Sequence, residues 1–111
     1  TRIIYMTSRL PKEDGLLSPL GYSVGSWDSN TLIVTTTRID YPYSIRGGIP
    51  QSMQAEIVER FSLGEDQGTL DWEATIFDPE TFTEPVTTIP THWKWVPGEE
   101  IRPYNCSLGP E

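Results

Sequence analysis

Residues 21–37 constrain the fold more than any other stretch, because they have the composition of one complete β-hairpin. Two arms rich in β-forming residues flank Asp28, Ser29 and Asn30, whose short polar side chains bond to nearby backbone and tolerate a turn. Residues 31–39 are dominated by β-branched side chains, which suit a pleated, half-buried surface better than a helix. The segment therefore predicts two adjacent antiparallel strands.

Alternating or β-rich patterns predict further strands on both sides of this hairpin. We expect them at residues 2–8, 55–63, 69–77, 86–96 and 101–106. Pro90 cannot donate to a strand ladder, so it demotes the first half of residues 86–96 to an edge position or a bulge. Residues 40–50 contain two prolines and paired glycines, which predict a long loop without regular structure, and long loops often carry function. Residues 51–60 have a competing interpretation, because residues 52–56 include good helix formers that Ser52 could cap, which allows a short helix or one turn entering the strand.

Consecutive antiparallel strands with short connections are typical of a meander. An amphipathic sheet must bury its apolar face by closing on itself or by packing against a second layer. A chain of 111 residues is large enough for one core and too small for two. We therefore predict a single all-β domain over residues 1–111, with about six strands forming a partial or complete lipocalin-like β-barrel. A partial barrel, completed by another segment or a second copy, is the leading architecture.

The charge balance argues against nucleic acid and anionic membrane surfaces as partners. With 16 acidic and 8 basic residues, the formal net charge of −8 has the wrong sign for contacts to phosphate groups. No apolar run approaches the roughly 20 residues of a membrane-spanning helix. The carboxylates are scattered, which favours a soluble surface over a cation site, and no Cys/His cluster offers metal ligands. We therefore predict no metal and no cofactor.

The cysteine content and the first residues bear on location. Cys106 is the single cysteine, so these residues cannot form an internal disulfide; an inert thiol is favoured, and a bond to a segment outside this sequence stays open. The chain starts at Thr1 without Met and runs directly into apolar residues, which predicts a processed or trimmed product. Removal of an export signal is one route to such a product. An extracytoplasmic location, periplasmic or secreted, is therefore expected, and an upstream segment could be missing.

Glu59 is the candidate catalytic residue. Strand alternation puts it on the same face as Ile57 and Phe61, and an inward carboxylate is costly unless it is paired or faces a wet cavity. In a cavity it could act as a general acid or a ligand anchor. Arg38, on the face of Leu32 in the preceding predicted strand, is a candidate partner. Glu59 could therefore belong to a structural ion pair or to a functional site. A β-bulge in this strand would move Glu59 to the opposite face of the sheet.

Aromatic side chains are the candidate ligand-binding residues. They can line a pocket for a flat or apolar ligand, or they can simply fill the core of a small sheet protein. The candidate ligand-binding set consists of Trp27, Arg38, Phe61, Trp72, Trp93 and Trp95.

Signals for nucleophilic or acid–base catalysis are weak. His92 is the single histidine, and alternation points it away from Trp93 and Trp95, which favours a solvated edge histidine. Ser23 matches G-x-S-x-G by letter, but that motif needs a strand-to-helix elbow, and here a second strand follows.

Residues 21–28 and 31–34 carry a family resemblance. They resemble the pattern G-H-S-x-G-x-W-E-G-D-T-L-V-V of a group of uncharacterised, exported bacterial β-rich proteins, and residues 57–61, 69–70, 75–79 and 104–106 look like later landmarks of that group. Tyr22 stands where the pattern has His, and Ser29 with Asn30 replaces Gly-Asp. The resemblance implies a β-rich fold and export, and it implies no chemistry.

The Gly25-x-Trp27 element is also similar to the Gly-x-Trp of lipocalin-type barrels, which bind small apolar ligands. Three functions follow as hypotheses. The first is a non-enzymatic β-barrel module that binds a small apolar ligand or a protein partner. The second is a small barrel enzyme of the isomerase, dehydratase or cyclase type that uses Glu59. The third is a structural subunit that forms homo-oligomers through exposed strand edges.

Overall fold

A computed structural model describes residues 2–6, 17–45 and 49–100 of the chain. These residues form nine strands and no helix, so no helix in the described part could span a membrane. The strands are β1 (Ile4–Met6), β2 (Tyr22–Asp28), β3 (Thr31–Thr37), β4 (Tyr43–Ile45), β5 (Ile49–Pro50), β6 (Glu56–Leu63), β7 (Thr69–Phe77), β8 (Val86–Thr87) and β9 (Thr91–Lys94).

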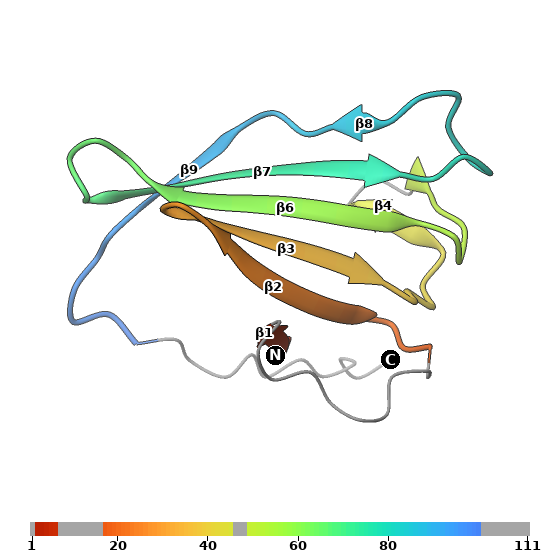
Figure 1. The fold of residues 1–111 in the computed structure, drawn as a ribbon, viewed down its shortest axis with the longest axis horizontal. Helices are drawn as coiled ribbons and strands as arrows, with labels where there is room; N and C mark the ends of the chain where they lie inside the picture. Colours follow the sequence, from red (N-terminus) through yellow and green to blue (C-terminus); the bar gives the residue numbers. More distant parts are fainter. Residues whose placement is uncertain (1, 7–16, 46–48, 101–111) are drawn as a thin grey trace, which may run out of the picture.

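The main sheet has the order β1-β2-β3-β6-β7, and the short strands β8 and β9 pair with successive parts of β7 (Figure 1). The sheet curls into a half-barrel. All of its pairs are antiparallel except β1 with β2, which run parallel. The predicted all-β meander with a partial barrel is therefore confirmed, and the parallel first strand is an addition to it.

The hairpin predicted at residues 21–37 is present. Tyr22 pairs with Thr37 at one end and Asp28 with Thr31 at the other, which leaves a two-residue turn. Ser29 occupies this turn with a φ of 54°, a left-handed conformation that short polar residues tolerate in tight turns. Local turn chemistry thus fixes the register of the first hairpin.

Strand register places alternate residues of the central strands on one concave face. This face consists of Ser23, Gly25, Trp27, Leu32, Val34, Thr36, Ile57, Glu59, Phe61, Leu63, Leu70, Trp72, Ala74 and Ile76. Val34, Glu59 and Ala74 form one row across β3, β6 and β7 and are all buried. The core therefore lies on the concave face, and the faces predicted for β6 and β7 are those observed.

Two connecting segments differ from the expectation or refine it. Residues 40–50 were expected to lack regular structure, but β4 and β5 pair there, with Tyr43 opposite Pro50. Pro50 is tolerated because an edge strand can leave one N–H position unused. Residues 52–55 form a turn rather than a helix before β6 begins, with the Ala55 N–H donating to the carbonyl of Ser52 at 3.2 Å. The strand predicted at residues 101–106 and Cys106 lie outside the described residues.

One strand was predicted over residues 86–96, with its first half at an edge or in a bulge, and the structure has two short strands on either side of Pro90. Val86–Thr87 and Thr91–Lys94 are separate strands on the same side of β7. Between them, Thr88 exchanges two hydrogen bonds with Ala74: its backbone N–H donates to the Ala74 carbonyl at 2.8 Å, and its hydroxyl accepts from the Ala74 N–H at 3.1 Å. The Thr88 hydroxyl therefore takes the place of a backbone carbonyl as the acceptor for β7 in the gap between β8 and β9.

Asp78 connects the end of β7 to the segment that enters β6. Its buried carboxylate accepts hydrogen bonds from the N–H of Ser52 at 2.7 Å, the hydroxyl of Ser52 at 2.6 Å and the hydroxyl of Thr81 at 2.8 Å. Burial raises the pKa of this carboxyl, but hydrogen bonds from Ser52, Thr81 and the backbone of Glu80 favour the charged form and leave the pKa below its ordinary value of 3.8. The ionised carboxylate is therefore part of the folded structure.

This arrangement predicts a specific response to acid. The pKa of Asp78 is lower in the folded state than in the unfolded state, so its stabilisation is present above a pH of about 4 and is lost as the pH falls through the folded-state pKa. We expect Asp78→Asn to lower the free energy of unfolding at pH 7 by about 1–3 kcal/mol. The variant should then lose less further stability than the unmodified protein between roughly pH 5 and pH 2. Urea unfolding across this range measures both effects, and an equally steep loss in the variant would contradict this role for Asp78.

Candidate ligand-binding site on the concave face

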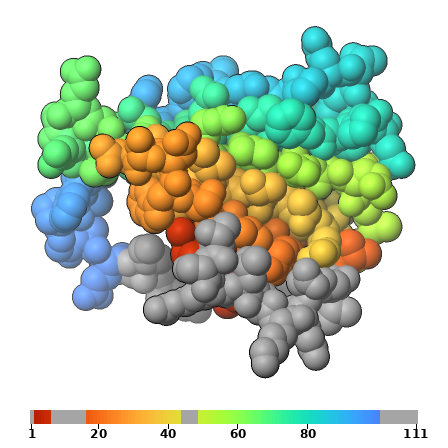
Figure 2. Space-filling model, in the orientation of Figure 1, coloured from red at the N-terminus to blue at the C-terminus, as the bar shows by residue number. Residues whose placement is uncertain are grey.

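Two hollows lie along the concave face. The Glu59 hollow has a volume of about 250 Å³, and Arg2, Gln51, Glu59, Trp72 and Ile76 are among its lining residues. The turn-end hollow is larger, at about 930 Å³, and lies where the β2–β3 and β6–β7 turns meet; Figure 2 shows these orange and green segments at one end of the molecule. Phe61 lines the turn-end hollow and is the register partner of Trp72, so the two hollows are neighbours on one face.

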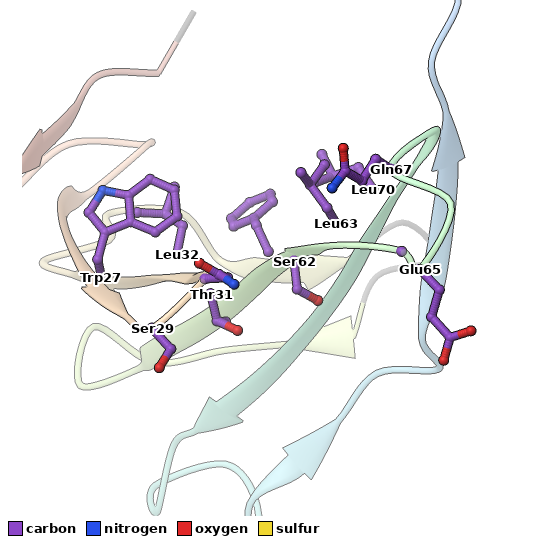
Figure 3. A pocket seen from close by; sticks show the side chains of 12 residues that line it. Trp27, Ser29, Thr31, Leu32, Ser62, Leu63, Glu65, Gln67 and Leu70 are labelled. Atoms are coloured by element: carbon purple, nitrogen blue, oxygen red, sulfur yellow. The ribbon is translucent and has the colours of Figure 1, made fainter.

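The turn-end hollow has an apolar side. Figure 3 shows Trp27, Leu32, Leu63 and Leu70 on one side of the strands, whereas Ser29, Thr31 and Ser62 point to the other. Trp27 is 65% exposed and Leu63 is 63% exposed. Large apolar side chains that are this accessible, gathered on a concave surface, make this hollow the candidate site for an apolar partner.

Glu59 lines the smaller hollow, and its carboxylate accepts hydrogen bonds from two side chains. The Arg2 guanidinium approaches it in a forked geometry, with Nη1 to Oε1 at 2.6 Å and Nη2 to Oε2 at 3.3 Å. The Trp72 indole N–H also donates to Oε2, at 3.0 Å. The Glu59 side chain is 9% exposed and that of Arg2 is 33% exposed. The inward carboxylate is thus compensated by a partly buried ion pair and an indole N–H.

The partner predicted for Glu59 is therefore corrected. Arg38 was expected to pair with it, but the described partner of Glu59 is Arg2. Arg38 has a φ of 57°, so the chain leaves the extended conformation there and the alternation of β3 no longer fixes its side. Its guanidinium lies 5.2 Å from the ring centre of Tyr22, which belongs to the convex face and stacks on Tyr5.

Arg2 was not singled out by the sequence pattern, although a signal for it was present. Residues 2–8 were predicted as a strand, and Arg2 has the same parity as Ile4 and Met6. Ile4 and Met6 pair with Ser23 and Gly25, which lie on the concave face. Alternate residues of a strand lie on the same face, so the pattern places Arg2 on the concave face with Ile4 and Met6, where it can reach the Glu59 carboxylate.

The predicted aromatic set is only partly brought together. Trp93 stacks on Phe61 with 6.3 Å between ring centres and lies 5.7 Å from the ring centre of Trp72. Trp27 lies on β2 and lines the turn-end hollow. Trp95 follows β9, is 68% exposed and lines a separate depression with Trp93. Phe61, Trp72 and Trp93 therefore form a contiguous cluster, with Trp27 and Trp95 at its outer limits.

Gln51 contributes a second polar group that the sequence pattern did not indicate. Its amide Nε2 donates to the backbone carbonyl of Tyr41 at 2.9 Å, and its Oε1 is buried without a hydrogen-bond donor among the described residues. Gln51, Tyr41 and Tyr43 all line the Glu59 hollow. The segment predicted as a long loop thus supplies part of the wall of this hollow.

The other candidates for chemistry, His92 and Ser23, line neither hollow. His92 is exposed on β9, with Nδ1 2.6 Å from the Asp71 carboxylate, and both residues belong to the convex face. The Ser23 hydroxyl is buried in a 2.7 Å hydrogen bond with the hydroxyl of Thr36. Within the described residues, no group of three or more His, Cys, Asp or Glu side chains is arranged to hold a metal ion.

Comparison with protein-family models, with curated proteins and with solved structures found no match to this chain. The resemblance to exported bacterial β-rich proteins therefore stays a prediction, as does an extracytoplasmic location. A functional proposal has to be based on the geometry of the concave face.

Proposed function

We propose that this protein binds a small apolar ligand on the concave face of its half-barrel. The observation that carries the proposal is the accessible apolar surface of Trp27 and Leu63 in the turn-end hollow, beside the half-buried Phe61. Exposed Trp93 stacks on Phe61 next to this hollow. Covering about 200 Å² of such surface contributes roughly 5 kcal/mol before the cost of association. Because association itself costs about 4 kcal/mol or more, measurable affinity requires a ligand that covers a larger area of this face.

An enzyme that uses Glu59 for proton transfer is less well supported. Both carboxylate oxygens already accept hydrogen bonds, from Arg2 and from Trp72. A general acid or base needs an oxygen within reach of the proton that it transfers. The geometry favours a Glu59 that holds the site together over one that reacts.

A protein partner or a second copy is the competing proposal, because the same accessible side chains could be covered by another chain. Trp27 and Trp95 are 65% and 68% exposed. A protein interface would bury such aromatic residues at its centre. Ligand binding and association are separated by experiment below.

The proposal predicts binding of a neutral apolar probe. We expect N-phenyl-1-naphthylamine to gain fluorescence when it is titrated into the protein, and Phe61→Ser to weaken its binding about tenfold or more, since an aromatic contact at the junction of the hollows is lost. Phe77→Ser is the matched control, because Phe77 lies at the end of β7 outside both hollows.

Two outcomes would count against ligand binding. One is a probe that gains no fluorescence, and the other is an equal loss of affinity in both variants. Sedimentation velocity over a range of protein concentrations is run in parallel. A concentration-dependent dimer that excludes the probe would replace ligand binding with association.

A further inference from the structure

We infer that the ligand is a cationic amphiphile. Its guanidinium or ammonium head replaces the Arg2 side chain on the Glu59 carboxylate, and its apolar body extends to the turn-end hollow. Arg2 occupies the head-group site in this structure and therefore competes with the ligand for Glu59. This inference rests on the proposed function and adds the chemical class of the ligand.

The acceptor side of the ion pair is built into the middle of the sheet. Glu59 of β6 lies between Val34 of β3 and Ala74 of β7, and all three residues are buried. The Trp72 indole N–H, also from β7, donates to the Glu59 Oε2 at 3.0 Å. The carboxylate is therefore held in position by the sheet and by Trp72, independently of Arg2.

The donor side of the ion pair is less firmly attached. Arg2 precedes β1 and has no register partner in the sheet among the described residues, and β1 itself is a three-residue strand at the edge of the sheet. The Arg2 side chain is one-third exposed, whereas that of Glu59 is largely buried. Solutes therefore reach the carboxylate from the side on which Arg2 lies. A ligand cation can take the place of Arg2 by the same route.

Such an exchange conserves the charge interactions of the hollow. Among the described residues that line it, the charged side chains are Arg2 and Glu59. A guanidinium or ammonium head donates to the carboxylate as Arg2 does, and the displaced Arg2 is hydrated, so no buried charge is left unpaired. An anionic head could bind Arg2 only by removing it from Glu59. A neutral head that displaced Arg2 would leave the carboxylate without a counter-charge.

The lining of the hollow also favours an organic cation. Tyr41, Tyr43 and Trp72 are part of it, and both tyrosines are about half exposed. Aromatic ring faces carry partial negative charge and attract cations. The formal net charge of −8 raises the local concentration of cations around the protein. Phe61, the register partner of Trp72, lines the turn-end hollow, so an alkyl chain on the head group reaches the accessible apolar surface.

The test compares octylguanidinium, 1-octanol and octanoate, which have the same alkyl chain and different heads. Each is used to displace N-phenyl-1-naphthylamine near neutral pH, below the concentration at which it forms micelles. We expect octylguanidinium to displace the probe at concentrations roughly tenfold or more below those of the other two compounds.

Removal of the internal competitor should strengthen this preference. A tethered side chain competes at an effective concentration in the millimolar range. Arg2→Met should therefore lower the concentration of octylguanidinium that displaces the probe by a further factor of about ten, and leave that of 1-octanol unchanged. Octylguanidinium should also raise the melting temperature of Arg2→Met more than that of the unmodified protein, because it restores the counter-charge of Glu59.

Glu59→Gln should abolish the advantage of octylguanidinium, because the head group then meets no carboxylate. Glu73→Gln is the matched control. It makes the same change of charge on the convex face, opposite Arg60, and Glu73 lines neither hollow, so this variant should keep the advantage. If Glu59→Gln or Arg2→Met does not fold, the three compounds on the unmodified protein and on Glu73→Gln still decide.

Three results would overturn the head-group inference while ligand binding stands. They are displacement by 1-octanol or octanoate that equals or exceeds that by octylguanidinium, loss of the advantage in Glu73→Gln, and an Arg2→Met variant that binds octylguanidinium no better than the unmodified protein. A protein that binds neither the probe nor any of the three compounds overturns both the inference and the proposed function.

Discussion

Replacing Arg2 with methionine is expected to lower the free energy of unfolding by about 2–3 kcal/mol. Loss of one partner leaves the Glu59 carboxylate, 9% exposed, without its counter-charge. Breaking a fully buried pair costs about 3–5 kcal/mol, and the smaller figure applies here because the Arg2 side chain is one-third exposed. Urea unfolding monitored by circular dichroism measures the change.

The decisive control is whether the effect of Glu59→Gln on the free energy of unfolding changes sign when Arg2 is replaced. Glu59→Gln alone should destabilise the protein, because it removes the ion pair. In the Arg2→Met background the same substitution should stabilise it, since the neutral amide no longer leaves a buried charge and its oxygen can still accept from the Trp72 indole. If Glu59→Gln has the same effect in both backgrounds, the two side chains are not coupled and the described ion pair does not contribute to stability.

Replacing Gly21 with alanine is expected to cost about 3 kcal/mol or more. Gly21 has a φ of 71°, which alone costs an L-residue about 1–2 kcal/mol. A Cβ at this position would also lie 2.5 Å from the backbone carbonyl oxygen of Thr37 and 2.8 Å from Ile39. The oxygen belongs to the end of β3, so it cannot move without disturbing the first hairpin.

Gly98→Ala separates the two contributions. Gly98 has a φ of 83°, but a Cβ there would meet no atom within 4 Å. Its substitution should therefore show only the conformational cost, about 1–2 kcal/mol. Thermal or urea unfolding of both variants gives the difference. Equal losses in the two variants would mean that the close approach of β3 to Gly21 does not constrain the structure.

The strands of this protein were predictable where local chemistry and burial agree. The β-branched residues of β3 and the polar turn at Ser29 set one hairpin, and the strict alternation of β7 set the face of Trp72. Pro90 marked the division between β8 and β9 because its missing N–H acts locally. In each case the observed strand or turn is determined by residues that are close together in the sequence.

The partners in the candidate site were less predictable, because they depend on distant segments. Arg2 is 57 positions from Glu59, and strand alternation pointed to Arg38 as the candidate partner instead. The left-handed backbone at Arg38 ends that alternation, and no local signal announced it. Gln51 likewise acquires its orientation from the Tyr41 carbonyl, ten positions earlier.

The division of the last predicted strand at Pro90 bears on aggregation. A half-barrel leaves two edges, and a long flat edge would act as a template for strands of other molecules. Here the strands beside β7 contain two and four residues and are separated by a proline, while β1 contains three. Neither described edge presents a long uninterrupted row of backbone donors and acceptors. Short, interrupted edges therefore limit strand pairing between molecules although the apolar concave face is open.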